Sequence, residues 1–178
     1  RDDARHVSVK LKNNISLHNF YVPAGGDIPD PKTNPKFKHK LEFINEMKNY
    51  FHKEKTKKRI LVGDLNIAPG ESDVWSHKQL KNVISHTDVE RNTILKILEK
   101  GNLIDVIRRV ITPPMNLFTW WSYRSLDYKK NNRGRRLDHI WVTNLKKFKT
   151  RNSKILVEFR DNLKPSDHVP ILSIIEII

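Results

Sequence analysis

The stretch Arg59-Ile60-Leu61-Val62-Gly63-Asp64-Leu65-Asn66 decides how this chain folds. Its apolar run predicts a short strand over residues 59–63 that is buried on both faces. The strand runs directly into a carboxylate, and a period of two puts Asp64 and Asn66 on the same side if the strand continues. Catalytic and ligand-binding groups often lie just beyond the carboxyl ends of strands, although the same pattern is also that of a simple Asx turn. Asp64 and Asn66 are therefore the first candidate site residues.

Strands and helices are interspersed on both sides of this stretch. The spacing of apolar residues predicts helices over residues 37–51 and 89–100, the second with Asp88 as its N-cap and Gly101 as its end. Residues 74–85 and 103–110 are expected to be irregular or short-helical, and residues 53–59 form a basic connector. Further strands are predicted over residues 7–11, 15–22, 117–123, 137–143, 155–159 and 170–178. This order favours an α/β or α+β fold with polar loops at strand ends.

The composition is that of one ordinary globular domain. The chain has 178 residues, of which 37% are hydrophobic and 30% charged, and it has no cysteine. A disulfide scaffold, a thiolate zinc site and a cysteine nucleophile are therefore excluded. No apolar run approaches the roughly 20 residues that span a bilayer. The start, Arg1-Asp2-Asp3-Ala4, is not signal-like and has no initiator Met, so we expect the chain to begin within a longer protein.

The charge balance points to a polyanionic partner. Lys and Arg number 34 against 20 Asp and Glu, which gives a net charge of +14. Such an excess suggests nucleic acid, an acidic membrane surface or phosphorylated substrates. The richness in Lys, Asn and Ile is also what AT-biased codon usage produces, so part of the excess can be genomic drift.

Two further stretches carry residues suited to chemistry. Ser166-Asp167-His168 offers a carboxylate and an imidazole just before the last predicted strand, although a polar turn would have the same composition. Asp138 lies within an otherwise apolar strand, where an unpaired charge is costly to bury. His168 is a natural partner, since a carboxylate can set the orientation and tautomer of an imidazole. His139 points to the opposite face and is expected to be a surface or packing residue.

Aromatic and basic side chains adjoin one another in the second half of the chain. Rings such as those in Phe118–Arg124 can stack on bases, or they can simply fill the core. The basic cluster that follows favours nucleic-acid binding over a solvated surface; it consists of Arg124, Lys129, Lys130, Arg133, Arg135 and Arg136. No Gly-rich phosphate loop, serine nucleophile elbow or HExxH motif is present. Carboxylates with Asn and His, and no nucleophile, suggest metal-assisted attack of water on a phosphodiester.

In this order and spacing, the motifs resemble the exonuclease III family of the endonuclease/exonuclease/phosphatase superfamily. The matching stretches span nearly the whole chain: residues 19–25, 63–69, 118–124, 132–138 and 166–170. The resemblance implies a four-layer α/β sandwich represented by its C-terminal portion, with residues 1–178 as a single, N-terminally truncated catalytic domain. The family's early strand Asn and its metal-binding Glu have no counterpart here.

The resemblance also implies a role for each site residue. Tyr21 approaches the scissile phosphate, Asp64 activates the attacking water, and Asn66 stabilises the developing oxyanion. Asp138 orients His168, which contacts the phosphate. Mg²⁺, with Mn²⁺ as an alternative, is held by residues that include Asp167. The implied metal ligands are Asp64, Asn66, Asp167 and His168, and the implied DNA contacts are Trp120, Trp121, Arg124, Arg133, Arg135 and Arg136.

The implied function is DNA repair. Members of the family cut duplex DNA 5′ to abasic sites and degrade it 3′→5′ from its ends, as monomers without a membrane, in the bacterial cytoplasm at the nucleoid. Two alternatives stay open: a phosphoesterase of the same superfamily with a non-DNA substrate, and a truncated, inactive remnant that still binds DNA. Because the Glu is missing, we expect residues 1–178 alone to bind Mg²⁺ weakly and to cleave abasic DNA very poorly.

Overall fold

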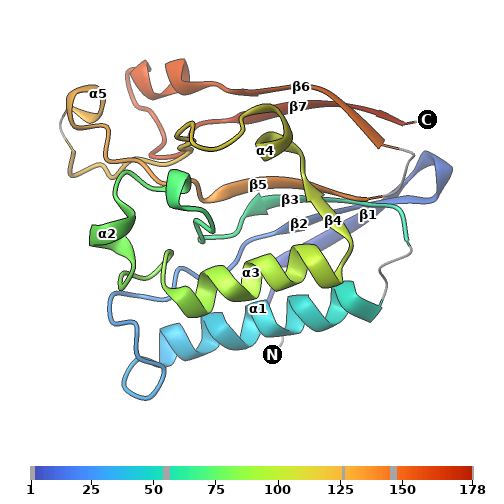
Figure 1. Ribbon diagram of the computed structural model, residues 1–178, viewed down its shortest axis with the longest axis horizontal. Helices are drawn as coiled ribbons and strands as arrows, with labels where there is room; N and C mark the ends of the chain where they lie inside the picture. The colour runs from blue at the N-terminus through green and yellow to red at the C-terminus, as the bar shows by residue number, and fades with distance from the viewer. Residues whose placement is uncertain (1–2, 54–56, 126, 145–147, 178) are drawn as a thin grey trace.

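The computed structural model describes residues 3–53, 57–125, 127–144 and 148–177. Its elements lie in layers, with helices below a central sheet and a hairpin above it (Figure 1). Among the described residues, no helix is long and apolar enough to cross a membrane. In chain order the elements are β1 (His6–Leu11), η1 (Lys12–Asn14), β2 (Ile15–Phe20), α1 (Pro35–Lys53), β3 (Arg59–Asp64), η2 (Glu71–Asp73), α2 (His77–Leu80), α3 (Asp88–Lys100), β4 (Leu103–Asp105), α4 (Val106–Val110), α5 (Tyr128–Asn131), β5 (Asp138–Thr143), β6 (Phe148–Ile155), η3 (Val157–Asp161) and β7 (Ile171–Ile177).

The centre of the fold is a five-stranded mixed sheet with the strand order β1-β2-β3-β5-β4. β2 and β3 run parallel, and the other neighbouring pairs are antiparallel. α1 makes the crossover that two parallel strands require. β3 lies in the middle of the sheet, where Leu61 and the following Leu65 are fully buried. This confirms the buried strand predicted over residues 59–63.

Helices α1 and α3 lie side by side and cover one face of the sheet (Figure 1). The apolar stripe of α1 points into the core between them and the sheet, as an amphipathic helix requires. Ile44, Met47 and Phe51 of α1 pack there with Ile94 of α3 and Trp141 of β5. The predicted helix over residues 37–51 is confirmed, and it extends by two residues at each end.

α3 begins at a capping box, one residue earlier than predicted. The Thr87 side chain accepts a hydrogen bond from the Glu90 backbone N–H, and the Glu90 carboxylate accepts one from the Thr87 backbone N–H. The N-cap is therefore Thr87, and the assignment of Asp88 as the cap is wrong. Asp88 lies in the first turn, where its charge interacts favourably with the helix dipole. Gly101 ends the helix as predicted.

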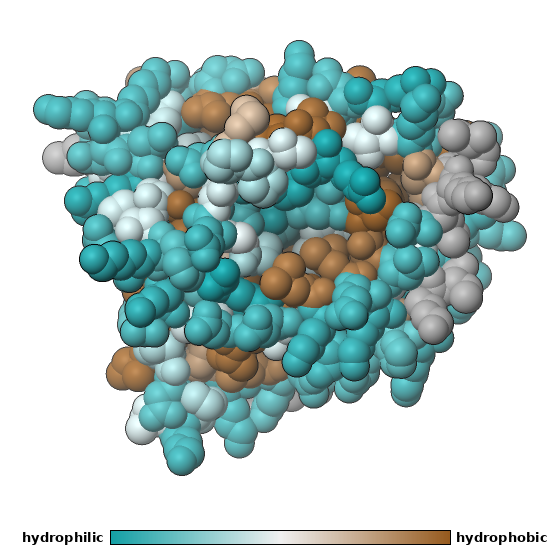
Figure 2. Space-filling view, in the orientation of Figure 1, coloured by the Kyte–Doolittle hydropathy of each residue, from teal (hydrophilic) through white to brown (hydrophobic). Residues whose placement is uncertain are grey.

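The other face of the sheet is covered by the two-stranded β6–β7 sheet and by α4. Ile140 and Val142 of β5 pack in this second core with Ile171 and Ile175 of β7. Hydrophilic residues cover most of one face of the molecule, with apolar residues gathered near its upper edge, its middle and its lower left (Figure 2). Two cores that sandwich a central sheet confirm the predicted mixed α/β architecture.

Two strand predictions are wrong. Residues 117–123 form no strand of either sheet among the described residues, and Trp120 makes only isolated bridges to Arg135 and His168. Residues 155–159 leave β6 at once and turn into η3. The strand β6 was missed because its sequence, FKTRNSKI, is mostly polar. Residues 54–56 of the predicted connector and Ile178 of the last predicted strand lie outside the described residues.

Candidate active site

Two aspartates face each other across neighbouring strands. Asp64, the last residue of β3, is paired in register with Asp138, the first residue of β5. Alternation places both on the same face as Val62 and Ile140, which pack toward the β6–β7 sheet. Like charges directly opposite each other destabilise an antiparallel pair. Folding alone does not favour this pairing, which makes it a candidate functional feature.

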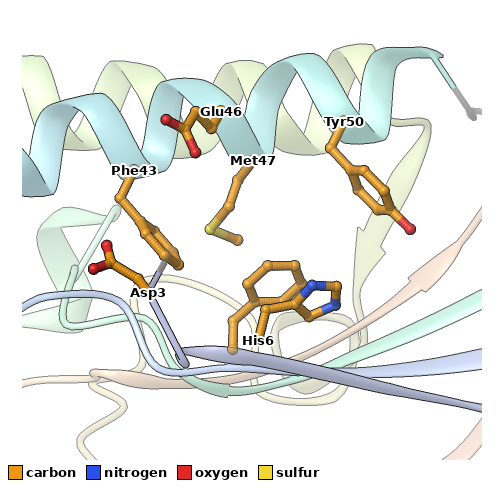
Figure 3. A pocket seen from close by; sticks show the side chains of 7 residues that line it. Asp3, His6, Phe43, Glu46, Met47 and Tyr50 are labelled. Atoms are coloured by element: carbon orange, nitrogen blue, oxygen red, sulfur yellow. The ribbon is translucent and has the colours of Figure 1, made fainter. Parts of the chain in front are cut away.

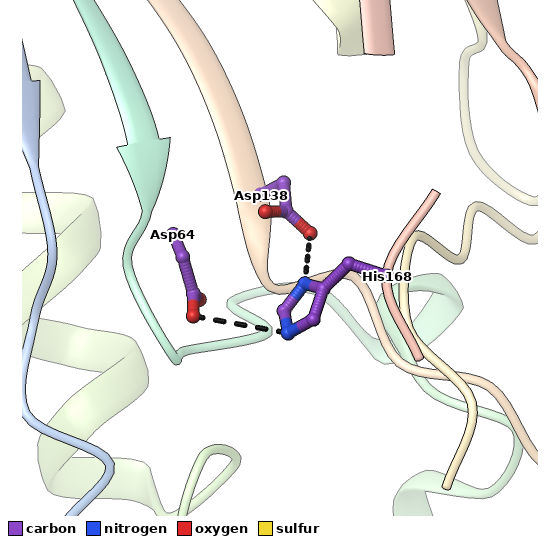
Figure 4. Close-up of side chains that lie close together, drawn as sticks. All are labelled: Asp64, Asp138 and His168. Atoms are coloured by element: carbon purple, nitrogen blue, oxygen red, sulfur yellow. Dashed lines mark hydrogen bonds and ion pairs between the residues drawn. The ribbon is translucent and has the colours of Figure 1, made fainter. Parts of the chain in front are cut away.

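His168 meets the two carboxylates from a distant segment of the chain. Its Nδ1 lies 2.8 Å from Asp138 Oδ2 in a hydrogen bond, and its Nε2 lies 3.9 Å from Asp64 Oδ2 (Figure 4). Backbone hydrogen bonds fix the loop that carries His168. In one of them, the Val169 N–H donates to the Thr119 carbonyl at 2.8 Å. The predicted hydrogen bond between His168 and Asp138 is confirmed.

Thr119 completes the setting of Asp138, a contact that sequence reasoning missed. Its Oγ1 donates to Asp138 Oδ2 at 2.6 Å and accepts from the backbone N–H groups of Leu137 and Asp138 at 3.0 and 3.1 Å. Thr119 is fully buried. Its hydroxyl therefore fixes the orientation of Asp138, which in turn orients His168. The feature of the sequence that could have predicted this contact is a polar residue, Thr119, between the aromatic residues Phe118 and Trp120.

Asn66 braces Asp64 from within the same loop. Its backbone N–H donates to Asp64 Oδ1 at 2.9 Å, and its Nδ2 donates to Asp64 Oδ2 at 3.0 Å and to the Val22 carbonyl at 2.9 Å. The φ angle of Asn66 is 52°, in the left-handed region that asparagine tolerates better than most residues. Asn66 thus orients the Asp64 carboxylate and ties it to the loop after β2.

Gly63 is required by the close approach of the chain beside it. Its φ angle is +132°, and a Cβ there would lie 2.0 Å from the Phe20 carbonyl oxygen and 2.7 Å from Asn19 Oδ1. Only a residue without a side chain fits such a position. The end of β3, with Asp64, can therefore lie close to the end of β2, after which Tyr21 follows.

The environment of Asp64 makes it a weaker acid than usual. Burial, and then the charge of Asp138, raise the pKa of Asp64 from 3.8 to about 6. The Asn66 hydrogen bond and the charges of His168 and Lys40 act in the opposite direction but are smaller. A carboxylate with a pKa near 6 can accept a proton close to neutral pH, as a general base must.

His168 is a stronger base than an ordinary histidine. Burial lowers its pKa, but the hydrogen bond and charge of Asp138, with the charges of Asp64 and Asp167, outweigh that effect. The pKa of His168 is therefore raised above 6.5. An imidazole in this setting can carry a positive charge near neutral pH and interact with an anion such as a phosphate.

The same three side chains form a candidate metal site. Ligand atoms of Asp64, Asp138 and His168 lie within 4.8 Å of one another. Carboxylate oxygens suit a hard divalent cation, and such an ion would relieve the repulsion between the two opposed carboxylates. The donor set therefore fits a divalent metal. Of the four predicted ligands, Asp64 and His168 belong to this cluster, which adds Asp138. The Asn66 side-chain amide donates to Asp64 Oδ2 and to the Val22 carbonyl, and the Asp167 carboxylate accepts a hydrogen bond from Trp120 Nε1 at 2.9 Å, so the roles of Asn66 and Asp167 as ligands stay predictions.

Tyr21 lies where β2 ends, next to the loop of Asp64. Its side chain is 54% exposed, and the Arg5 guanidinium lies 4.9 Å from the centre of its ring. The following Val22 N–H donates to the Asp64 carbonyl at 2.9 Å. The phenol is thus accessible beside the site, and its role at the scissile phosphate stays a prediction.

The predicted DNA contacts separate by exposure. Arg124 and Arg133 are exposed, and the Arg133 guanidinium lies 4.8 Å from the centre of the Trp75 ring. Trp120 and Arg135 are half-buried, with the guanidinium 5.5 Å from the indole centre. These four side chains keep some surface for a ligand, so their role in DNA binding stays a prediction.

For Trp121 and Arg136 the structure corrects the prediction. Trp121 is 3% exposed and packs in a small core against Phe118. Arg136 is 2% exposed, and its guanidinium forms ion pairs with Asp73 at 2.9 Å and Asp105 at 2.5 Å. Neither side chain reaches a surface that DNA could contact. The pattern of basic residues near aromatic ones could not predict that Arg136 is buried, because its partners Asp73 and Asp105 are distant in the sequence.

His139 confirms one alternative and excludes the other. It lies on the opposite face of β5 from Asp138 and is fully buried against Trp141. Its Nε2 donates to the Ile67 carbonyl at 2.9 Å, and burial lowers its pKa to about 3. His139 is a packing residue and not a surface residue.

Two hollows differ in their relation to this site. His168 lines one of about 350 Å³, formed with residues of the segment 159–170. Another, of about 370 Å³, lies between α1 and β1, and none of its lining residues belongs to the site (Figure 3). Its walls are Asp3, His6, Phe20, Phe43, Glu46, Met47 and Tyr50. Of these two hollows, only the one beside His168 includes a residue of the site, and neither Asp64 nor Asp138 lines it.

A mixed α/β sandwich that gathers carboxylates and a histidine at the ends of its central strands has the architecture of a phosphoester hydrolase. The chain belongs to the endonuclease/exonuclease/phosphatase family, whose model matches residues 25–168. The family resemblance inferred from the motifs is thereby confirmed.

Individual relatives agree with this assignment. The chain is 28% identical to exodeoxyribonuclease III of Haemophilus influenzae over 165 residues, which are 88% of this chain and 60% of that protein. Among solved structures, an AP endonuclease from Archaeoglobus fulgidus matches with a TM-score of 0.86 and 28% identity, over 97% of this chain and 65% of that one. The 3′ phosphatase NExo from Neisseria, solved with a product DNA hairpin, matches with a TM-score of 0.83 and 27% identity, over 99% and 66%. The chain spans about half the length of the curated relatives that it matches.

Proposed function

We propose that this chain is the catalytic domain of a Mg²⁺-dependent DNA repair nuclease, which cuts DNA phosphodiesters 5′ to abasic sites and degrades duplex DNA 3′→5′ from its ends. The observation that carries the proposal is the opposed pair Asp64 and Asp138 with His168 bound to it. The names of the relatives, an exodeoxyribonuclease III and an AP endonuclease, support the same substrate.

In the proposed reaction, Asp64 accepts the proton of the water that attacks phosphorus. Asn66 holds the Asp64 carboxylate in place through two hydrogen bonds. His168, oriented by Asp138, places its Nε2 toward the phosphoryl oxygens, where a positive charge stabilises the transition state more than the ground state. A divalent cation held by Asp64 and Asp138 would supply further stabilisation of the phosphoryl charge and the leaving oxygen.

The DNA-binding part of the proposal has its own support. A net charge of +14 attracts the phosphate backbone. The exposed Tyr21, Arg124 and Arg133 offer a phenol and two guanidinium groups to a duplex. A monomer that repairs chromosomal DNA in this way would work at the nucleoid in the bacterial cytoplasm.

The test is a cleavage assay with a duplex that carries one abasic site, at enzyme excess so that slow turnover is visible. We expect incision 5′ to the site with Mg²⁺, similar incision with Mn²⁺, and none with EDTA. The undamaged duplex and a small phosphodiester, bis(p-nitrophenyl) phosphate, serve as the comparison substrates. Binding without cleavage in every metal would contradict the proposed activity and favour the inactive remnant. Cleavage of the small diester alone would favour a non-DNA phosphoesterase.

A further inference from the structure

Lys40 of α1 is a fully buried lysine, with 0% of its side chain exposed. Charged residues are almost never buried to this extent unless they are paired. The position belongs to the buried stripe of α1, since it lies three residues after Phe37 and four before Ile44. An apolar residue is therefore the expected occupant, and a lysine there needs an explanation.

The ammonium group of Lys40 uses its three N–H donors on three separate segments. Its Nζ lies 2.6 Å from Glu90 Oε1 in an ion pair. It also donates to the Asn66 carbonyl at 2.8 Å and to the Ala24 carbonyl at 3.2 Å. An ammonium has three donors and no acceptor, so this lysine is fully satisfied.

The two carbonyls belong to the loops that carry the candidate catalytic residues. Ala24 lies in the loop after β2, which begins with Tyr21, and Asn66 lies in the loop after β3, directly beyond the strand's last residue, Asp64. The same loops also bond to each other through Asn66 Nδ2 and the Val22 carbonyl at 2.9 Å. Lys40 thus holds both loops against α1.

The counter-charge of Lys40 is held by the segment that leads into α3. The Glu90 carboxylate accepts hydrogen bonds from Ser85 N–H at 3.0 Å and from the Thr87 hydroxyl at 2.6 Å, both just before the helix begins. Gly25 makes room for the lysine stem, since a Cβ at that position would lie 2.9 Å from Lys40 Cδ. The arrangement is built from α1, α3 and the loop after β2 together.

We propose that Lys40, paired with Glu90, is a positioning residue that aligns the loops of Tyr21 and Asp64 for the reaction; this rests on the proposed function. Burying an ion pair is a poor source of stability, because an apolar pair of similar size often stabilises as well or better. An apolar residue could not donate to the carbonyls of Asn66 and Ala24, whereas the ammonium bonds both.

The first test measures the contact itself in the unmodified protein by NMR. A scalar coupling across the hydrogen bond between Lys40 Nζ and the Asn66 carbonyl carbon is expected, with ammonium protons that exchange slowly with water. A Lys40 ammonium that exchanges as fast as that of the exposed Lys38, with no such coupling, would overturn the proposal. This measurement does not depend on any enzymatic activity.

The second test separates positioning from stability. In Lys40→Met/Glu90→Gln, both charges are removed together, so no buried charge is left alone. We expect a melting temperature near that of the unmodified chain, yet an Asn66 side-chain amide that exchanges about 10-fold faster or more. Lys38→Met, two residues earlier on the exposed face of α1, is the matched control and should change neither. Unchanged Asn66 exchange in the folded double variant would contradict the positioning role.

The third test links positioning to the reaction. For the folded double variant we expect kcat on abasic duplex to fall about 10- to 100-fold, with KM nearly unchanged. A small misplacement of catalytic groups reduces a rate by about this factor. A normal kcat with fast Asn66 exchange would overturn the positioning role and leave the nuclease assignment intact. If the unmodified protein does not cleave DNA while the NMR contact is present, the proposed function fails and the loop contact stands.

Discussion

His168 is bonded to Asp138 through Nδ1 at 2.8 Å, which turns its Nε2 toward Asp64 at 3.9 Å (Figure 4). A histidine with one nitrogen held by a carboxylate has a defined tautomer and orientation at the other. The orientation of His168 Nε2 is therefore fixed by Asp138 on β5. Asp64, the proposed base for the attacking water, lies on β3. The register between these two strands sets the distance between Asp64 and Asp138.

We predict that, in a chain that also carries the N-terminal part of the family's fold, Asp64→Asn and His168→Ala each lower abasic-site incision by about 10²- to 10⁴-fold, the range typical of lost acid–base or charge stabilisation. Both residues are placed to act in the transition state, so duplex affinity should change little. Single-turnover incision and a fluorescence binding titration measure the two quantities. His52→Ala, at the exposed end of α1, is the control. Near-normal incision by either site variant would remove it from the mechanism.

The raised pKa of Asp64, about 6 against 3.8, predicts a specific pH dependence of stability. The Asp64 carboxylate binds a proton more tightly in the folded protein than in the unfolded chain. The contribution of this protonation to the free energy of unfolding is fully present below about pH 3.8 and is lost as the pH rises through about 6. Asp64→Asn lacks this titration, so its free energy of unfolding relative to the unmodified protein should rise by ~1–3 kcal/mol between about pH 4 and pH 7. Denaturant titrations across this range test it, and a constant difference would contradict it.

Arg136 and Arg133 should behave oppositely although they are three residues apart. Arg136→Ala leaves the largely buried Asp105 without its ion-pair partner and leaves Asp73 with Arg108 alone, so it should lower the free energy of unfolding by ~3–5 kcal/mol. Arg133→Ala should change stability by less than about 0.5 kcal/mol. It should instead reduce the slope of log affinity for duplex DNA against log salt by about 1. A normal salt slope for Arg133→Ala would assign that residue to the solvated surface.

Thr119→Val should damage the site through Asp138. The substitution keeps the side-chain shape but removes the hydroxyl that bonds Asp138 Oδ2 and two backbone N–H groups. Loss of stability of ~1–3 kcal/mol is expected from the groups left unsatisfied. Incision should fall as well, because Asp138 no longer has a fixed orientation for His168. Thr119→Ser, which keeps the hydroxyl, should restore most of both, and failure of Ser to do so would indicate a packing role.

Local patterns were sufficient for most of the regular elements and for part of the site. The apolar run at 60–62 predicted a buried strand, and the stripe of α1 predicted its buried face. The pair Asp138 and His168 was predicted because a carboxylate in an apolar strand needs a partner. β6 escaped detection, since a polar strand at the molecular surface has little periodicity in hydrophobicity.

What the sequence by itself determined is the family, the candidate residues Asp64, Asn66, Asp138 and His168, and a positive charge that suggests a polyanionic partner. Beyond the predicted pair of Asp138 and His168, only the tertiary structure decided which of these residues meet. The pairing of Asp64 with Asp138 depends on strand register, and the burial of Arg136 depends on Asp73 and Asp105. Neither can be read along the chain, because side chains from distant segments set the charge, burial and hydrogen bonding of each group only once those segments pack together.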